Sequence, residues 1–165
     1  MIDREDAPRR ELYLLRHADA GDPGEWRGDD ASRPLSDKGR RQASALGRFL
    51  GRRGFVPDIV LSSPRMRARQ TAEFVAVTTK MKVELDDRLA APLDLAMLEA
   101  LLAESDGRRL LLVGHDPELS ELAATLIGCP LLPMSKGTLA RIDVSPPLYP
   151  GHGRLRWLLP PELVG

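Results

Sequence analysis

Cysteine is almost absent from this chain, because Cys129 is the only one among 165 residues. A single cysteine cannot form an internal disulfide, which favours a reducing compartment. The chain also lacks an apolar run long enough to cross a bilayer, and its first ten residues lack the apolar core of a signal peptide. We therefore predict a cytoplasmic protein with no membrane partner.

Net charge is lacking as well, since 24 basic side chains balance 24 acidic ones. A general nucleic-acid-binding protein is usually basic, so this balance argues against a nucleic-acid partner. The charges are unevenly placed, however: residues 38–69 contain Lys38 and eight arginines but only one acid, Asp58. This basic segment is either a solvated face or the rim of an anion-binding site.

The spacing of apolar residues predicts an α/β fold. Strands alternate with helices, which is typical of a three-layer sandwich in which a mostly parallel central sheet has helices on both faces. The length fits a single domain over residues 1–165, with residues 1–10 as a loose leader. The expected strands are 11–17, 57–63, 82–85, 108–115, 137–144 and 153–159, and the expected helices are capped by Ser36, Ser63, Asp94 and Asp116.

Three of these strands end in residues suited to phosphate chemistry. The first strand ends at Arg16 and His17, and the fourth ends at His115. The second leads into a helix whose first turn carries Arg67. Ligands of open α/β sheets bind beyond the carboxyl ends of the strands, so the sequence predicts that two histidines and at least two arginines meet there.

Such a cluster favours phosphoryl transfer over other chemistry. Arginine binds phosphate oxygens with paired N–H donors, and a neutral histidine can attack phosphorus and carry the phosphoryl group covalently. Taken singly, each residue also fits a structural role, such as a histidine hydrogen-bonded at a strand end. The histidines lack the spacing of metal ligands, and the chain has no Walker loop, dinucleotide fingerprint or nucleophile elbow, so we expect no metal and no cofactor.

At these positions the sequence resembles the histidine phosphatase superfamily, which has the phosphoglycerate mutase-like fold. The stretch LLRHADA is similar to its Arg-His-Gly motif with Ala18 in place of glycine, LSSPRMRARQTAE to its Ser-Pro-x-x-Arg-Ala element, and LLLVGHDPELSEL to its second histidine motif. The resemblance implies that His17 is the nucleophile and that Arg16, Arg67 and His115 bind the phosphoryl oxygens. It extends from about residue 12 to residue 160.

Within the superfamily, the RHADA and GTLARID stretches are most similar to SixA-type phosphohistidine phosphatases. The resemblance implies a substrate phosphorylated on histidine, carried by a phosphotransfer domain of a signalling protein. Many superfamily members place a glutamate after the third strand as general acid, where this chain has Ala91 in DRLAAPLD. Asp19 is either a substitute acid or an exposed loop residue.

The missing acid favours a phosphohistidine substrate. An alkoxide leaving group needs a proton, whereas imidazole, with an ordinary pKa of about 6.5, can leave as a neutral ring. We therefore expect a metal-independent phosphatase that forms a phosphohistidine intermediate on His17. Its partner would be a phosphorylated protein or a small phosphorylated metabolite. The alternatives are a phosphatase for small phosphoesters and a phosphate-binding module without turnover.

Overall fold

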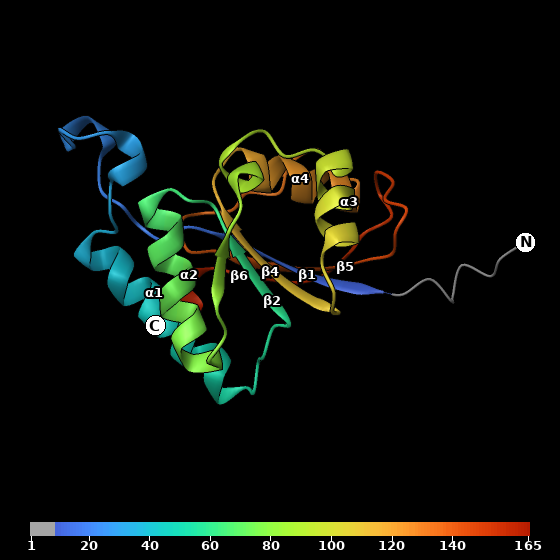
Figure 1. Cartoon of the computed structure of the whole chain (residues 1–165), viewed down its shortest axis with the longest axis horizontal. Coiled ribbons are helices and arrows are strands. Elements are labelled where there is room, and N and C mark those ends of the chain that lie inside the picture. The colour runs from blue at the N-terminus through green and yellow to red at the C-terminus, as the bar shows by residue number, and fades with distance from the viewer. Residues whose placement is uncertain (1–8) are drawn as a thin grey trace, which may run out of the picture.

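The computed structural model describes residues 9–165, which form a six-stranded sheet with helices on both faces (Figure 1). The sheet order is β3-β2-β4-β1-β5-β6. The strands are β1 (Arg10–Arg16), β2 (Ile59–Ser62), β3 (Val83–Leu85), β4 (Arg109–Gly114), β5 (Leu139–Val144) and β6 (Arg154–Leu159). The helices are α1 (Asp37–Arg52), α2 (Met66–Thr79), α3 (Leu95–Glu104) and α4 (Glu118–Ile127).

The predicted three-layer α/β sandwich is confirmed. Strands β3, β2, β4 and β1 run parallel to one another, β5 is antiparallel to β1, and β6 closes one edge antiparallel to β5. Of the expected loose leader, residues 1–8 lie outside the described part of the chain, and Arg10 is already the first residue of β1. Over residues 9–165, no helix combines the length and apolar character that a bilayer crossing requires.

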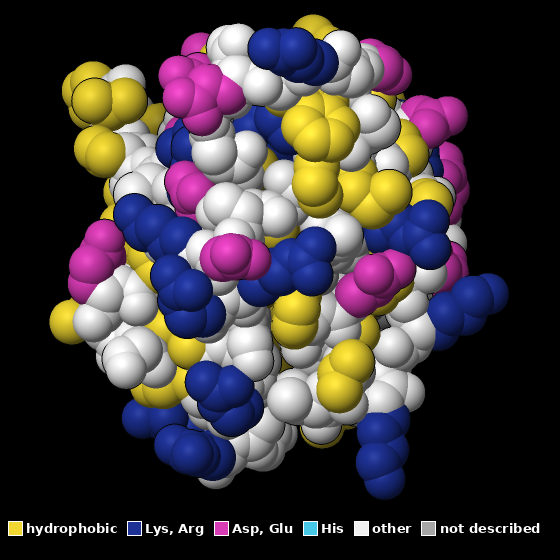
Figure 2. Space-filling model, turned by 90° about the vertical axis from the view of Figure 1, so that its left-hand side faces the viewer, with side chains coloured by type: hydrophobic (Ala, Val, Ile, Leu, Met, Phe, Trp, Pro, Cys, Tyr) yellow, Lys and Arg dark blue, Asp and Glu magenta, His cyan; other side chains and the backbone are white. Residues whose placement is uncertain are grey.

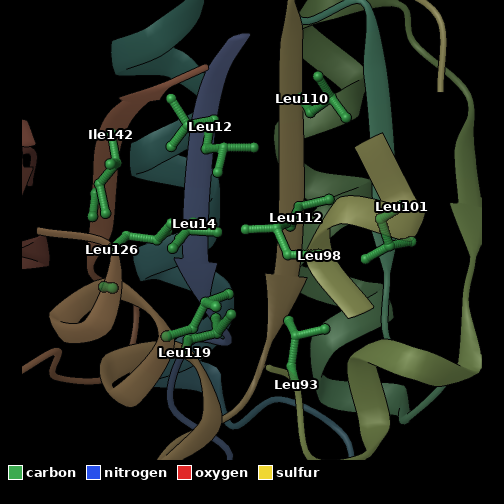
Figure 3. Packing of buried hydrophobic residues seen from close by; sticks show 14 of the residues in the cluster. Leu12, Leu14, Leu93, Leu98, Leu101, Leu110, Leu112, Leu119, Leu126 and Ile142 are labelled. Atoms are coloured by element: carbon green, nitrogen blue, oxygen red, sulfur yellow. The ribbon is translucent and has the colours of Figure 1, made fainter. Parts of the chain in front are cut away.

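Each face of the sheet has its own apolar core, because alternate residues of a strand point to opposite faces. Leu12 and Leu14 of β1 pack with leucines of α3 and α4, as Figure 3 shows. Tyr13 and Leu15 pack on the other face with residues of α1 and α2. The two central strands, β1 and β4, are therefore buried on both sides, which fixes their carboxyl ends firmly in the interior.

Side-chain caps explain where two of the four helices begin, whereas α4, expected to be capped by Asp116, begins at Glu118 with no side-chain cap. The side chains of Ser36 and Asp94 accept hydrogen bonds from backbone N–H groups in the first turns of α1 and α3, as predicted. The prediction for α2 is wrong: the helix begins at Met66 and has no side-chain cap. The hydroxyl of Ser63, expected to be that cap, instead contacts His115 and the backbone of Arg65.

Candidate active site

The structure brings the four predicted pocket residues together at the carboxyl ends of the central strands. Arg16 is paired with Gly114 in the register of β1 and β4, so the histidines that follow these two residues lie next to each other. The ring centroids of His17 and His115 are 5.2 Å apart. Arg67 reaches the same place from the first turn of α2, and its side chain is buried.

The ring of His17 is held in one tautomer. Its Nδ1 lies 2.7 Å from the carbonyl oxygen of Ala18, and a carbonyl can only accept, so Nδ1 carries the proton. Burial lowers the pKa of His17 to about 4, and the charges of Arg67 and Arg16 act in the same direction. The ring is therefore neutral at pH 7, with the lone pair of a potential nucleophile on Nε2.

His115 is oriented by Ser63, a residue that sequence reasoning had placed in a helix cap. The Ser63 hydroxyl oxygen accepts a hydrogen bond from the backbone N–H of Arg65 and lies 2.8 Å from Nε2 of His115. Burial, foremost, lowers the pKa of His115 to about 3, so its ring is neutral too. If the hydroxyl proton is donated to Nε2, the ring proton is left on Nδ1.

Three polar atoms around this pocket are buried and have no hydrogen-bond partner within the described chain. They are Nε of Arg16, Nε of Arg67 and Nδ1 of His115. Leaving a buried donor unpaired costs about 1–3 kcal/mol, so native proteins rarely keep one without a reason. All three can be donors, and together they suit a ligand that offers several acceptor oxygens and negative charge, such as a phosphoryl group.

Both arginines are also anchored through their terminal guanidinium nitrogens. The guanidinium of Arg67 donates to the backbone oxygen of Asp30 at 2.8 Å and to its carboxylate at 3.0 Å. Arg16 donates to the carbonyl of Met134 at 2.7 Å and faces Asp116 at 3.4 Å. These contacts fix each guanidinium while leaving its Nε unpaired in the pocket.

The carboxylate of Asp30 faces three arginines. It accepts a hydrogen bond from Nε of Arg33 at 3.0 Å, and the guanidinium of Arg65 lies 3.9 Å away. The hydrogen bond from Arg33 and the charge of Arg67 hold the pKa of Asp30 below its ordinary value. Figure 2 shows acidic and basic side chains interspersed on the side of the molecule toward which β1 runs.

Asp19 is not free to donate a proton at neutral pH. Its carboxylate accepts a hydrogen bond from the hydroxyl of Ser36 at 2.5 Å, and Nζ of Lys136 lies 3.4 Å away. The bond from Ser36 is the main reason that the pKa of Asp19 is lowered. The packing is tight here, because a Cβ on Gly39 would lie 1.9 Å from the carbonyl oxygen of Asp19. Ala91 is exposed and brings no carboxyl group.

Within residues 9–165, no cluster of three or more histidine, cysteine, aspartate or glutamate side chains is placed to hold a metal ion. The positive charge of the pocket comes from its arginines.

The protonation of His17 is directly measurable. We expect ¹⁵N-edited NMR of the imidazole groups to show a neutral ring with the proton on Nδ1 at pH 6–7, and half-protonation at about pH 4, because burial opposes the charged form. Uptake of the second proton by His17 near pH 6.5, the ordinary value, would contradict this description.

Comparison with known proteins agrees with the geometry. The sequence model of the Histidine phosphatase superfamily (branch 1) matches residues 12–91. An uncharacterised protein of Picosynechococcus is 36% identical over 121 residues, which cover 70% of this chain and 72% of that protein.

Solved structures extend the match to almost the whole chain. The protein histidine phosphatase SixA complexed with tungstate is 25% identical, with a TM-score of 0.79 over 94% of this chain and 99% of that one. A mycobacterial glucosyl-3-phosphoglycerate phosphatase is 21% identical, with a TM-score of 0.69 over 90% and 97% of the two chains, and shows the shared fold. The predicted phosphoglycerate mutase-like fold is confirmed, and the chain belongs to the histidine phosphatase superfamily.

Proposed function

We propose that this protein hydrolyses a phosphohistidine on a signalling phosphotransfer protein, without a metal, through a phosphohistidine intermediate on His17. One observation carries the catalytic part of the proposal: three buried polar atoms without a partner belong to the residues that accompany a neutral histidine, His17. A phosphoryl group would satisfy Nε of Arg16, Nε of Arg67 and Nδ1 of His115 together. The enzyme would bind such a phosphotransfer protein in the cytoplasm.

The first step transfers the phosphoryl group to the enzyme. The lone pair on Nε2 of His17 forms a bond to phosphorus while the bond from phosphorus to the leaving nitrogen breaks. The carbonyl of Ala18 holds the Nδ1 proton and so stabilises the positive charge that grows on the ring. Arg16, Arg67 and His115 donate to the non-bridging oxygens as charge redistributes.

The second step regenerates the enzyme. Water forms a new bond to phosphorus while the bond to Nε2 of His17 breaks, and inorganic phosphate leaves after the water has lost a proton to phosphate or solvent. His17 returns to its neutral form with the proton on Nδ1. The arginines balance the charge of phosphate throughout, so this scheme needs no cation from solution.

The substrate class is inferred from the two positions at which the sequence offered a possible general acid. Position 91 carries a methyl group, and Asp19 is held as a carboxylate by Ser36. A histidine leaving group departs as neutral imidazole if its second nitrogen is protonated, whereas a serine alkoxide requires an acid. The structural similarity to SixA, a protein histidine phosphatase, supports the same substrate class.

Substrate choice is tested by comparing P–N with P–O hydrolysis. We expect a higher kcat/KM for a phosphohistidine peptide than for a phosphoserine peptide of the same sequence. Ala91→Glu should raise the phosphoserine rate more than the phosphohistidine rate, because the new carboxyl group can protonate an alkoxide. Ala91→Gln is the matched control, with equal size and no acid, and should leave the ratio unchanged.

The alternatives make different predictions in the same assay. A wild-type enzyme that prefers phosphoserine, or a small sugar phosphate, would overturn the phosphohistidine assignment and leave the role of His17 intact. A phosphate-binding module would bind these compounds without releasing phosphate from any of them. The neutral, oriented ring of His17 favours turnover over mere binding.

A further inference from the structure

A second cavity of about 470 Å³ lies at the other end of the sheet from the two histidines. It is bordered by the first half of β1, the start of β4, the antiparallel pair β5 and β6, and the last turn of α1. Tyr13 borders the cavity and lies four residues before His17 on the same stretch of chain, so about 13 Å of extended chain separates the two residues. The volume is within the range of small-molecule sites.

Aromatic rings form much of the cavity wall. The chain has only seven aromatic residues, and four of them border this cavity: Tyr13, Phe49, Phe55 and Trp157. The ring centroid of Tyr13 lies 4.7 Å from that of Phe55 and 5.9 Å from that of Trp157. Aromatic faces and edges of this kind pack favourably against a further flat ring.

Basic groups outnumber acidic groups around the same space. Arg53, Arg109 and Arg141 border the cavity, and Glu11 is the acid that borders it. The buried carboxylate of Glu11 lies 3.4 Å from the nearest guanidinium nitrogen of both Arg109 and Arg141, and 3.1 Å from that of Arg108, which adds a third arginine. Asp143 pairs with Arg141 at 3.1 Å, so within residues 9–165 two carboxylates face four arginines: Arg53, Arg108, Arg109 and Arg141.

The side chains of Arg53 and Tyr13 leave the cavity with a surplus of positive charge. Arg53 has no ion pair within residues 9–165, and its guanidinium lies 3.5 Å from the ring centroid of Phe49. The hydroxyl of Tyr13 donates to Glu11, and burial is the main reason that the pKa of Tyr13 rises to about 12. The phenol therefore stays neutral and adds no negative charge.

We propose that this cavity is a binding site for a small anion that carries a flat aromatic ring, and that nucleoside monophosphates are the ligand class that matches it. The base would pack against the ring of Trp157. The phosphate would pair with Arg53 and Arg109, whose guanidinium groups are accessible to solvent. A nucleoside alone leaves the surplus charge unmatched, and a sugar phosphate alone leaves the rings unmatched.

Binding of AMP tests the proposal without any measurement of catalysis. The chain has two tryptophans, so Trp26→Phe leaves Trp157 as the only tryptophan reporter. AMP titrated into this protein should change the fluorescence of Trp157 saturably, with a Kd in the range of about 1 µM to 1 mM. Adenosine and ribose 5-phosphate should each bind at least about tenfold more weakly, because each lacks one half of the ligand.

Paired variants locate the site. Arg53→Ala should weaken AMP binding at least about tenfold, since it removes a cation that has no acidic partner. Arg52→Ala is the matched control: Arg52 is the exposed neighbour in α1, does not border the cavity, and should leave AMP binding unchanged. Arg67→Ala, in the pocket of His17, should leave it unchanged as well.

The proposal is overturned by any of three results. The first is no saturable change up to about 10 mM AMP. The second is equal binding of AMP and of either half-ligand. The third is loss of AMP binding in Arg67→Ala with retention in Arg53→Ala, which would place AMP in the pocket of His17. None of these results would affect the proposed phosphatase activity.

Discussion

Replacement of His17 by alanine should lower kcat by at least about four powers of ten, because the nucleophile is lost and Nε2 of the neighbouring His115 is already engaged by the hydroxyl of Ser63. The measurement is release of inorganic phosphate from a phosphohistidine peptide and from an aryl phosphate. In the wild type, quenching without acid should trap phosphate on His17. Near-normal turnover by the alanine variant would refute the mechanism.

The pH dependence of stability shows whether His17→Ala still folds normally. The pKa of His17 is about 4 in the folded protein and about 6.5 in the unfolded chain. Between these two pH values, the folded protein therefore binds fewer protons at His17 than the unfolded chain does. The contribution of His17 to stability is therefore present above pH 6.5 and is lost as the pH falls toward 4. His17→Ala should keep the wild-type circular dichroism spectrum and lose less stability than the wild type across this pH window.

Arg67→Ala should lower kcat by about two to four powers of ten, by analogy with the loss of other preorganised donors to a transition state. The guanidinium is buried and held by Asp30, so its Nε is already in place before substrate binds. The effect should fall more on kcat than on KM, because the developing charge is stronger in the transition state.

Two arginines of the same helical segment serve as controls. Arg69 pairs with Glu73 on the surface, and Arg69→Ala should change kcat little. Arg65 lies at the rim, 3.9 Å from Asp30, and Arg65→Ala should have a much smaller effect than Arg67→Ala. A larger loss for Arg65→Ala than for Arg67→Ala would mean that the wrong arginine has been assigned to the phosphoryl oxygens.

The sequence predicted the elements whose causes are local. Ser36 and Asp94 cap their helices through bonds to residues three positions away, and Gly128 ends α4 with a positive φ. The strand ends that carry Arg16, His17 and His115 followed from apolar runs and from the general geometry of parallel sheets. These signals can be read without knowing the tertiary structure.

What the sequence could not show depends on contacts between distant segments. Asp30 and Arg67 are 37 positions apart, and nothing in either neighbourhood marks them as partners. Ser63 has the usual features of a helix cap, yet its hydroxyl lies against His115, which is 52 positions away. The Ser63 hydroxyl contacts the buried ring of His115 and does not cap the helix, and α2 begins later than predicted, at Met66.

The pairing of β1 with β4 has a consequence for thermal inactivation. These strands are buried on both faces, and the register Arg16–Gly114 sets the separation of the two histidines through main-chain hydrogen bonds. Segments of this kind open to solvent only when the whole domain unfolds, whereas surface loops fray at much lower free energies. We therefore expect the amides of β1 and β4 to exchange most slowly, and we expect heating to separate the two histidines only when the sheet is lost cooperatively.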